Sequence, residues 1–157
     1  MLRGESVKVE RIFISPKKRT EQIDCESISV QFGMGIKGDR NFGKNRHSGQ
    51  NITLVEAEEI ELFCDEHSRL LDLSLLRRNI VTRGIKLNEL TGVEFRIGEV
   101  RLRGVELCEP CVVVGNILRS DSFSKAAVVK HWVNRGGLRA DVLSDGEILR
   151  GDLIQIS

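Results

Sequence analysis

The stretch that decides the fold is EFRIGEVRLRGVELCEPC, residues 94–111. Within it, Glu94–Ile97 and Val100–Leu107 alternate apolar with charged side chains, which is the period of a half-buried β-strand. The stretch ends in a Cys-x-x-Cys segment, where Pro110 fixes the backbone and removes an amide donor. Two strands leading into a rigid turn that carries two thiols are therefore the starting point for the rest of the chain.

Similar patterns recur on both sides of this stretch. Alternating or β-branched runs predict further strands at residues 6–15, 28–32, 51–55, 77–82, 112–115, 138–143 and 148–156, the last two around a turn at 144–146. Apolar spacings of three and four residues predict helices at 56–67 and 123–133, and a polar helix end is expected at 73–76. Many short strands with a few short α-helices predict a mainly β fold, a closed or nearly closed β-barrel.

Composition sets the broad class of protein. A chain of 157 residues with 40% hydrophobic residues is expected to form a single domain over residues 1–157. The net charge of +1 favours neither nucleic acid nor a membrane surface as a partner. The sequence has no secretory signal and no long apolar run, so we expect a cytoplasmic protein whose four cysteines are mostly reduced thiols.

The Cys108-x-x-Cys111 pair permits several kinds of chemistry. It could be a zinc half-site, a dithiol redox pair, one working thiolate with a neighbour, or two buried inert thiols. The other cysteines and histidines are scattered singly, which disfavours structural zinc, and strand-like sequence on both sides disfavours a thioredoxin-like pair. Glu109 and Pro110 disfavour two buried inert thiols, because the proline forms a rigid turn that could present Cys111 at the start of a strand. We expect one of these thiols to carry chemistry.

Three further segments could bind an anion. In the segment 77–79, two guanidinium groups offer bidentate forks for phosphate and Asn79 adds a donor and an acceptor. The basic run 17–19 and the glycine-bearing loop 35–40 are the other two, although the loop lacks a Walker or dinucleotide-binding pattern. Each segment alone is more consistent with a solvated surface than with a ligand site.

The order of the motifs, from residue 9 to the C-terminus, resembles the MOSC domain family, whose name denotes the C-terminal domain of molybdenum cofactor sulfurases. The matching motifs are GIKGDRNFG at 35–43, NITLVEAEEIE at 51–61, RRNIVTRGI at 77–85, FRIGEVRLRGVELCEPC at 95–111, HWVNRGGLRADVL at 131–143 and GEILRGD at 146–152. The resemblance implies a β-barrel-like fold of the MOSC or pyruvate-kinase-barrel-like type.

The resemblance also implies roles for individual residues. Relatives that hold molybdenum cofactor ligate the metal with the thiol that matches Cys111. They grip the pterin phosphate with groups that match Arg40, Arg77 and Asn79, and with a lysine approximated by Lys17 or its neighbour. Where many relatives have a histidine after Gly-Asp-Arg, this chain has asparagine, and His47 is our candidate for that polar place.

Three functions follow from the resemblance. The domain could carry persulfide sulfur on Cys111, received from a partner cysteine desulfurase. It could bind molybdenum cofactor for a molybdoenzyme or a cofactor-biosynthesis protein. It could also be a molybdenum-dependent oxidoreductase component that reduces N-hydroxylated compounds with electrons from a separate electron-transfer protein.

A comparison with the other domains of larger relatives helps to choose among these functions. Eukaryotic sulfurases carry a separate pyridoxal phosphate domain for which this chain has no room, so any desulfurase must be a separate, pyridoxal phosphate-dependent partner. We favour the carrier or the cofactor binder, because the sequence contains no electron-transfer cofactor motif.

Overall fold

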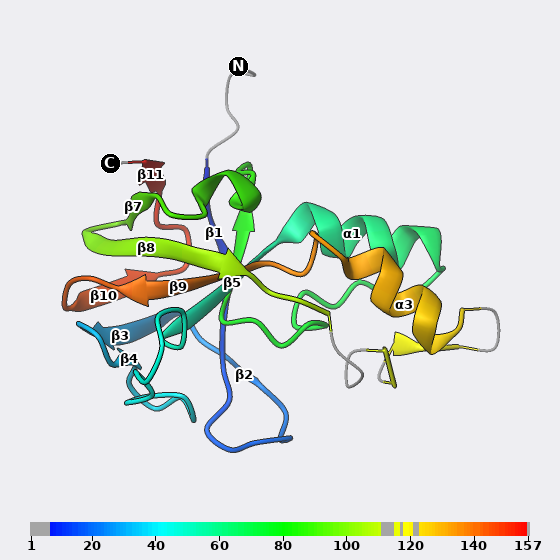
Figure 1. Cartoon of the computed structure of the whole chain (residues 1–157), viewed down its shortest axis with the longest axis horizontal. Coiled ribbons are helices and arrows are strands. Elements are labelled where there is room, and N and C mark those ends of the chain that lie inside the picture. The colour runs from blue at the N-terminus through cyan, green and yellow to red at the C-terminus, as the bar shows by residue number, and fades with distance from the viewer. Residues whose placement is uncertain (1–6, 111–114, 117, 121–122, 157) are drawn as a thin grey trace.

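The computed structural model describes residues 7–110, 115–116, 118–120 and 123–156. It confirms a mainly β fold with two α-helices and one 3₁₀ helix among these residues (Figure 1). The elements, in chain order, are β1 Lys8–Ile14, β2 Ile23–Asp24, β3 Ser27–Gln31, β4 Gly35–Ile36, β5 Ile52–Glu56, α1 Ala57–Glu66, β6 Ile80–Arg83, η1 Leu87–Leu90, β7 Glu94–Ile97, β8 Val100–Leu107, α3 Lys125–Trp132, β9 Leu138–Val142, β10 Gly146–Leu149 and β11 Ile154–Ile156. No helix in the described ranges is long and apolar enough to cross a membrane.

The main sheet curls into a barrel. Its eight strands run in the order β11-β7-β8-β9-β5-β6-β1-β2, and only the β5–β6 pair is parallel. β11, at one end of this order, meets β1, next to the other end, because the Val9 amide donates to the Asp152 carbonyl and the Ile154 amide donates to the Val7 carbonyl, each at 2.9 Å. The first half of β1 thus lies beside β11 and closes the barrel there, as a barrel-like fold requires.

A second sheet of three strands, in the order β10-β3-β4, packs over the barrel. Its inward side chains, among them Ile28, Val30 and Ile148, belong to the same buried apolar cluster as the barrel interior. The sheet therefore covers barrel residues that would otherwise face water.

A second core lies between the barrel wall and the two helices. β5 and β6 are buried on both faces: Leu54 and Ile80 point into the barrel core, whereas Val55 and Val81 point into the second core. Phe63 of α1 and Trp132 of α3, both fully buried, fill that second core. The apolar spacing of the two helix sequences is thus explained by one shared contact with the sheet (Figure 1).

Most of the expected elements are confirmed, among them the strand at 138–143, which is β9, but the predicted single strand at 148–156 is wrong. The segment expected as one strand at 148–156 is divided between β10, in the small sheet, and β11, in the barrel. The break is a turn at which the Leu149 amide donates to the Asp152 carboxylate at 2.8 Å, with Gly151 at φ 92°. Ile148, Ile154 and Ile156 keep a spacing of two across the turn, so alternation by itself does not reveal it.

Two other predicted elements, at 73–76 and 112–115, are not found as expected among the described residues. Residues 73–76 form a turn and not a helix end, because the Asp72 carboxylate accepts hydrogen bonds from the Ser74 amide and hydroxyl, a local side-chain turn that competes with a helix. The strand expected at 112–115 lies outside the described residues, apart from Gly115, which is helical.

Candidate functional site

Ser15, at the end of β1, joins two of the segments predicted to bind an anion. Its hydroxyl accepts a hydrogen bond from the Arg77 guanidinium at 3.2 Å, and its carbonyl accepts one from the Arg40 amide at 2.8 Å. Its own amide donates to the buried Asp39 carboxylate at 2.9 Å. We call this contact of Ser15, Asp39, Arg40 and Arg77 the Ser15 junction. Sequence reasoning did not identify Ser15 or Asp39 as its organisers, although Asp39 lies in the quoted Gly-Asp-Arg motif.

Asn79 faces the protein interior. Its side-chain oxygen accepts hydrogen bonds from the Thr53 amide at 3.1 Å and the Thr53 hydroxyl at 3.2 Å, and its side-chain nitrogen donates to the Phe13 carbonyl at 3.1 Å. The residue is 6% exposed. Asn79 therefore ties β1, β5 and the start of β6 together and holds the arginines beside it in place.

Arg77 and Arg78 extend from this anchor in different directions. Arg77 has a φ of 59°, a left-handed conformation that costs a non-glycine residue about 1–2 kcal/mol. Its guanidinium donates to the Thr20 carbonyl at 2.7 Å as well as to Ser15, which ties it to the loop after β1. The Arg78 guanidinium instead donates to the Gly136 carbonyl at 2.9 Å.

The arm of Arg78 leads to the thiol segment. Cys108 is 2% exposed, and its amide donates to the Gly137 carbonyl at 2.8 Å. Burial raises the pKa of the Cys108 thiol, and the nearby Arg78 and Arg139 only partly oppose the rise. Cys108 is thus a buried, protonated thiol at neutral pH, which leaves the other thiol of the pair as the candidate nucleophile or ligand. Cys111 itself lies outside the described residues.

The other two predicted residues are exposed. Lys17 lies in the loop after β1, where its carbonyl accepts a hydrogen bond from the Thr20 hydroxyl at 2.8 Å. This is the loop that Arg77 grips, so Lys17 belongs to the same region. His47 is held differently: its amide donates to Gln50 at 3.1 Å, and no hydrogen bond or ion pair among the described residues connects it to the Ser15 junction.

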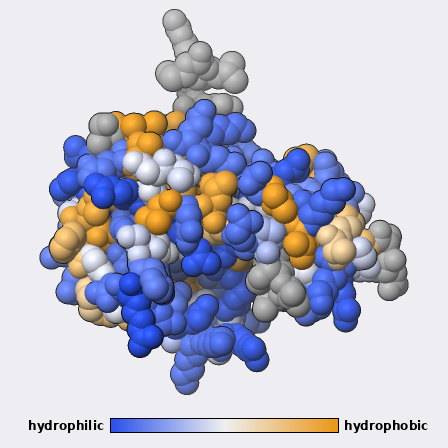
Figure 2. Space-filling view, in the orientation of Figure 1, coloured by the Kyte–Doolittle hydropathy of each residue, from blue (hydrophilic) through white to orange (hydrophobic). Residues whose placement is uncertain are grey.

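A depression of about 530 Å³ borders the Ser15 junction. Two arginines, two carboxylates and three uncharged residues line it: Arg69, Arg77, Glu21, Asp72, Gln22, Ser74 and Leu75. The side-chain oxygen of Gln22 is buried with no hydrogen-bond partner in the described part of the chain. Figure 2 shows a mostly hydrophilic surface where the β2 region projects from the molecule. A polar ligand suits this surface better than an apolar one.

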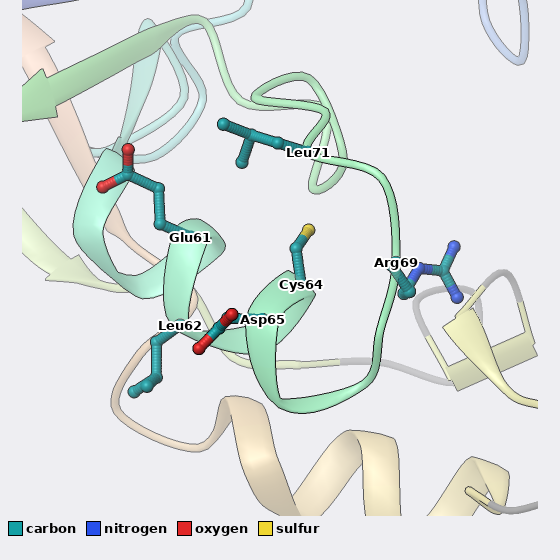
Figure 3. A pocket seen from close by; sticks show the side chains of 6 residues that line it. All are labelled: Glu61, Leu62, Cys64, Asp65, Arg69 and Leu71. Atoms are coloured by element: carbon teal, nitrogen blue, oxygen red, sulfur yellow. The ribbon is translucent and has the colours of Figure 1, made fainter.

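A separate depression of about 540 Å³ lies on the outer side of α1. Figure 3 shows the Cys64 sulfur pointing from the helix toward the segment of Leu71, with Glu61 and Asp65 beside it. None of the residues predicted for cofactor binding lines this depression. Cys64 is 3% exposed and packs in the second core, as expected for a structural cysteine.

Comparison with known proteins places this geometry in a family. The model of the MOSC domain matches residues 29–155. The chain belongs to the MOSC domain family. The family is associated with molybdenum cofactor. No curated protein matches the sequence.

Solved structures share this MOSC fold. The YuaD protein from Bacillus subtilis is 22% identical, with a TM-score of 0.79, and the match covers 96% of this chain and 94% of that one. YiiM from Escherichia coli is 15% identical, with a TM-score of 0.69 and coverage of 98% and 70%. YiiM from Geobacillus stearothermophilus is 13% identical, with a TM-score of 0.69 and coverage of 96% and 75%.

The arginines at and beside the Ser15 junction have no carboxylate partner among the described residues. Arginines on the barrel wall, such as Arg83, Arg101 and Arg103, pair with glutamates. In the described ranges Arg40, Arg77 and Arg78 form no ion pair, and the nearby Asp39 carboxylate accepts from the backbone amides of Ser15 and Asn41. Cations without a carboxylate partner, held by backbone contacts, are the arrangement that an anionic ligand completes.

Proposed function

We propose that this MOSC domain binds molybdenum cofactor through its phosphate at the Ser15 junction, and that Cys111 is the thiolate that ligates molybdenum or carries persulfide sulfur. The observation that carries the proposal is that the Arg77 guanidinium and the Arg40 backbone amide both donate to Ser15, which brings the two segments together. Arg78 links the segment of Arg77 to Gly136, beside Cys108. One short basic segment thus connects the predicted phosphate anchors to the region of Cys108.

The residues at the junction fit the chemistry of the cofactor. Guanidinium groups without a carboxylate partner suit a phosphate. The Gln22 side-chain oxygen, which has no hydrogen-bond partner among the described residues, suits an N–H donor such as those on a pterin ring. A soft thiolate suits a thiophilic metal. When bound, the cofactor supplies a molybdenum centre with oxo and sulfur ligands. Arg40 and Arg77 would hold the phosphate, Lys17 would add charge at the rim, and Asn79 would act by positioning Arg77.

The carrier form of the proposal needs no oxidant. The Cys111 thiolate attacks the outer sulfur of a persulfide on a partner cysteine desulfurase, forming a new S–S bond and breaking the partner's S–S bond. The partner leaves as a thiolate, and Cys111 holds the sulfur at the same oxidation level. The buried, protonated thiol of Cys108 is a poor competitor for this attack.

Metal and pterin analysis tests cofactor binding. Protein purified from a cofactor-producing host should contain molybdenum and pterin, and Arg77→Gln and Arg40→Gln should each lose both. A single charge-assisted hydrogen bond contributes about 1.5–3 kcal/mol, so each change should weaken binding roughly 10- to 100-fold. Arg96→Gln, which removes an exposed arginine on β7, is the matched control and should retain the cofactor. Equal loss in all three variants, or no cofactor in the wild type, would contradict the proposal.

Mass spectrometry tests the thiol. After incubation with a cysteine desulfurase and cysteine, the wild type and Cys108→Ser should gain a sulfur adduct, whereas Cys111→Ser should not. Equal labelling in both variants would refute the assignment to Cys111. Turnover of an N-hydroxylated compound by molybdenum-loaded protein with an artificial electron donor would favour the oxidoreductase instead.

A further inference from the structure

Two histidines and a glutamate meet where α1 ends beside α3, away from the MOSC site. Glu66 is the last residue of α1, His67 is its C-cap, and His131 lies in the last turn of α3. Their candidate ligand atoms, the imidazole nitrogens and a carboxylate oxygen, all lie within 4.8 Å of one another. Figure 1 shows the two helices side by side at the end of the molecule opposite β3 and β10.

Aromatic rings hold both imidazoles in place. The His67 ring stacks on Phe123, with centroids 4.1 Å apart and planes 29° apart. The His131 ring meets the edge or face of Phe63 and of Trp132, each with centroids 5.0 Å apart. Imidazoles fixed in this way lose little conformational entropy when they bind a ligand, so the group is preorganised.

The His131 side chain contains an unpaired polar atom. Its Nε2 is buried and has no hydrogen-bond partner among the described residues. Leaving a buried polar atom unpaired is unfavourable, and native proteins pair most such atoms. An ion bound by this nitrogen, with His67 and Glu66 completing the set, would pair it.

The donor set selects the class of ion. Two imidazoles and one carboxylate are the ligands of zinc sites that keep one position open, whereas Mg²⁺ and Ca²⁺ prefer oxygen donors. Tetrahedral zinc ligands lie about 3.3 Å apart, given zinc–ligand bonds of about 2.0 Å. The separations of up to 4.8 Å would close by small rotations of the three side chains, of which Glu66 is exposed to solvent.

Two charged side chains, Arg135 and Glu59, lie near this group. Arg135 opposes a cation here, but it lies 4.0 Å from the Glu59 carboxylate, so the local field is partly offset. We propose that Glu66, His67 and His131 bind one divalent transition ion of the zinc class, which fastens the end of α1 to α3. The site shares no residue with the Ser15 junction, so it stands or falls independently of the proposed cofactor function.

Titration with Zn²⁺ alone tests this site. Because thiolates are zinc ligands, every variant is made in a Cys111→Ser background, which removes the Cys-x-x-Cys pair as a competing site. Isothermal titration calorimetry should show one ion per chain, and thermal unfolding followed by circular dichroism should show a higher melting temperature with Zn²⁺. His67→Gln and His131→Gln should each weaken binding at least tenfold, and Glu66→Gln should weaken it less.

His47→Gln is the matched control, since it removes the one remaining histidine, and it should bind like the background protein. Glu66→Gln should fold like the background protein, because this exposed side chain packs in neither core. Weaker Zn²⁺ binding by this variant therefore reports on the ligand and not on misfolding. Binding that persists in both His67→Gln and His131→Gln, binding lost in His47→Gln, or no binding at millimolar Zn²⁺ would overturn the proposal.

Discussion

Replacing Asn79 with alanine tests whether Asn79 stabilises the fold around the Ser15 junction or contacts a ligand directly. The Asn79 side chain makes three hydrogen bonds, two with Thr53 and one with the Phe13 carbonyl. Alanine removes all three and leaves the Thr53 amide and the Phe13 carbonyl unpaired inside the protein. Phe13 is 7% exposed, so water cannot readily replace the lost donor.

The expected loss follows from these contacts. A net contribution of about 1 kcal/mol for each hydrogen bond gives a loss of about 3 kcal/mol. For a chain of this length, 1 kcal/mol corresponds to about 2–4 °C in melting temperature, so Asn79→Ala should lower the melting temperature by roughly 6–12 °C.

Thermal and urea unfolding of the cofactor-free protein, followed by circular dichroism, measures this loss. Asn88→Ala is the control: Asn88 is exposed and donates one hydrogen bond, to the Asn134 carbonyl at 2.9 Å. Its loss should be below about 1 kcal/mol. If Asn79→Ala matched this control in stability and still lost molybdenum and pterin, the positioning role would be refuted and direct ligand contact supported.

Two further predictions concern the barrel. Burial raises the pKa of Glu56 above its ordinary value of 4.5, so the folded state holds this proton more tightly than the unfolded state and its stability falls as pH rises through that interval. Glu56→Gln should therefore gain urea resistance over the wild type near pH 7 and lose the advantage below about pH 4; an equal gain at both pH values would contradict this. Gly137→Ala should prevent folding, because its Cβ would overlap the Leu54 carbonyl at a φ of 109°, whereas Gly92→Ala, at φ 76° with open space around it, should cost only about 1–2 kcal/mol by circular dichroism. Equal stability of the two glycine variants would show that the backbone at Gly137 can move away.

Local patterns predicted the strands well where one face of a strand is polar. Alternation located β7 and β8 exactly, and it located β1 and β3 to within two residues at either end. The reason is that a strand with one wet face must repeat every two residues, whatever it pairs with. The ordered motifs identified the family because each motif is a property of a short segment and can be recognised without the tertiary structure.

The sequence by itself determined the period of each segment, the family, and the residue types available for phosphate, thiolate and metal chemistry. Only the tertiary structure decided which of these residues meet. Ser15 and Arg77 are 62 positions apart, and His67 and His131 are 64 apart, so their contacts depend on how the barrel closes and how the helices pack. Asn79 points inward because its hydrogen-bond partners, Thr53 and Phe13, are distant in the chain. The last predicted strand is divided because β10 and β11 pair in different sheets. Both features depend on residues that are close in space and distant in sequence.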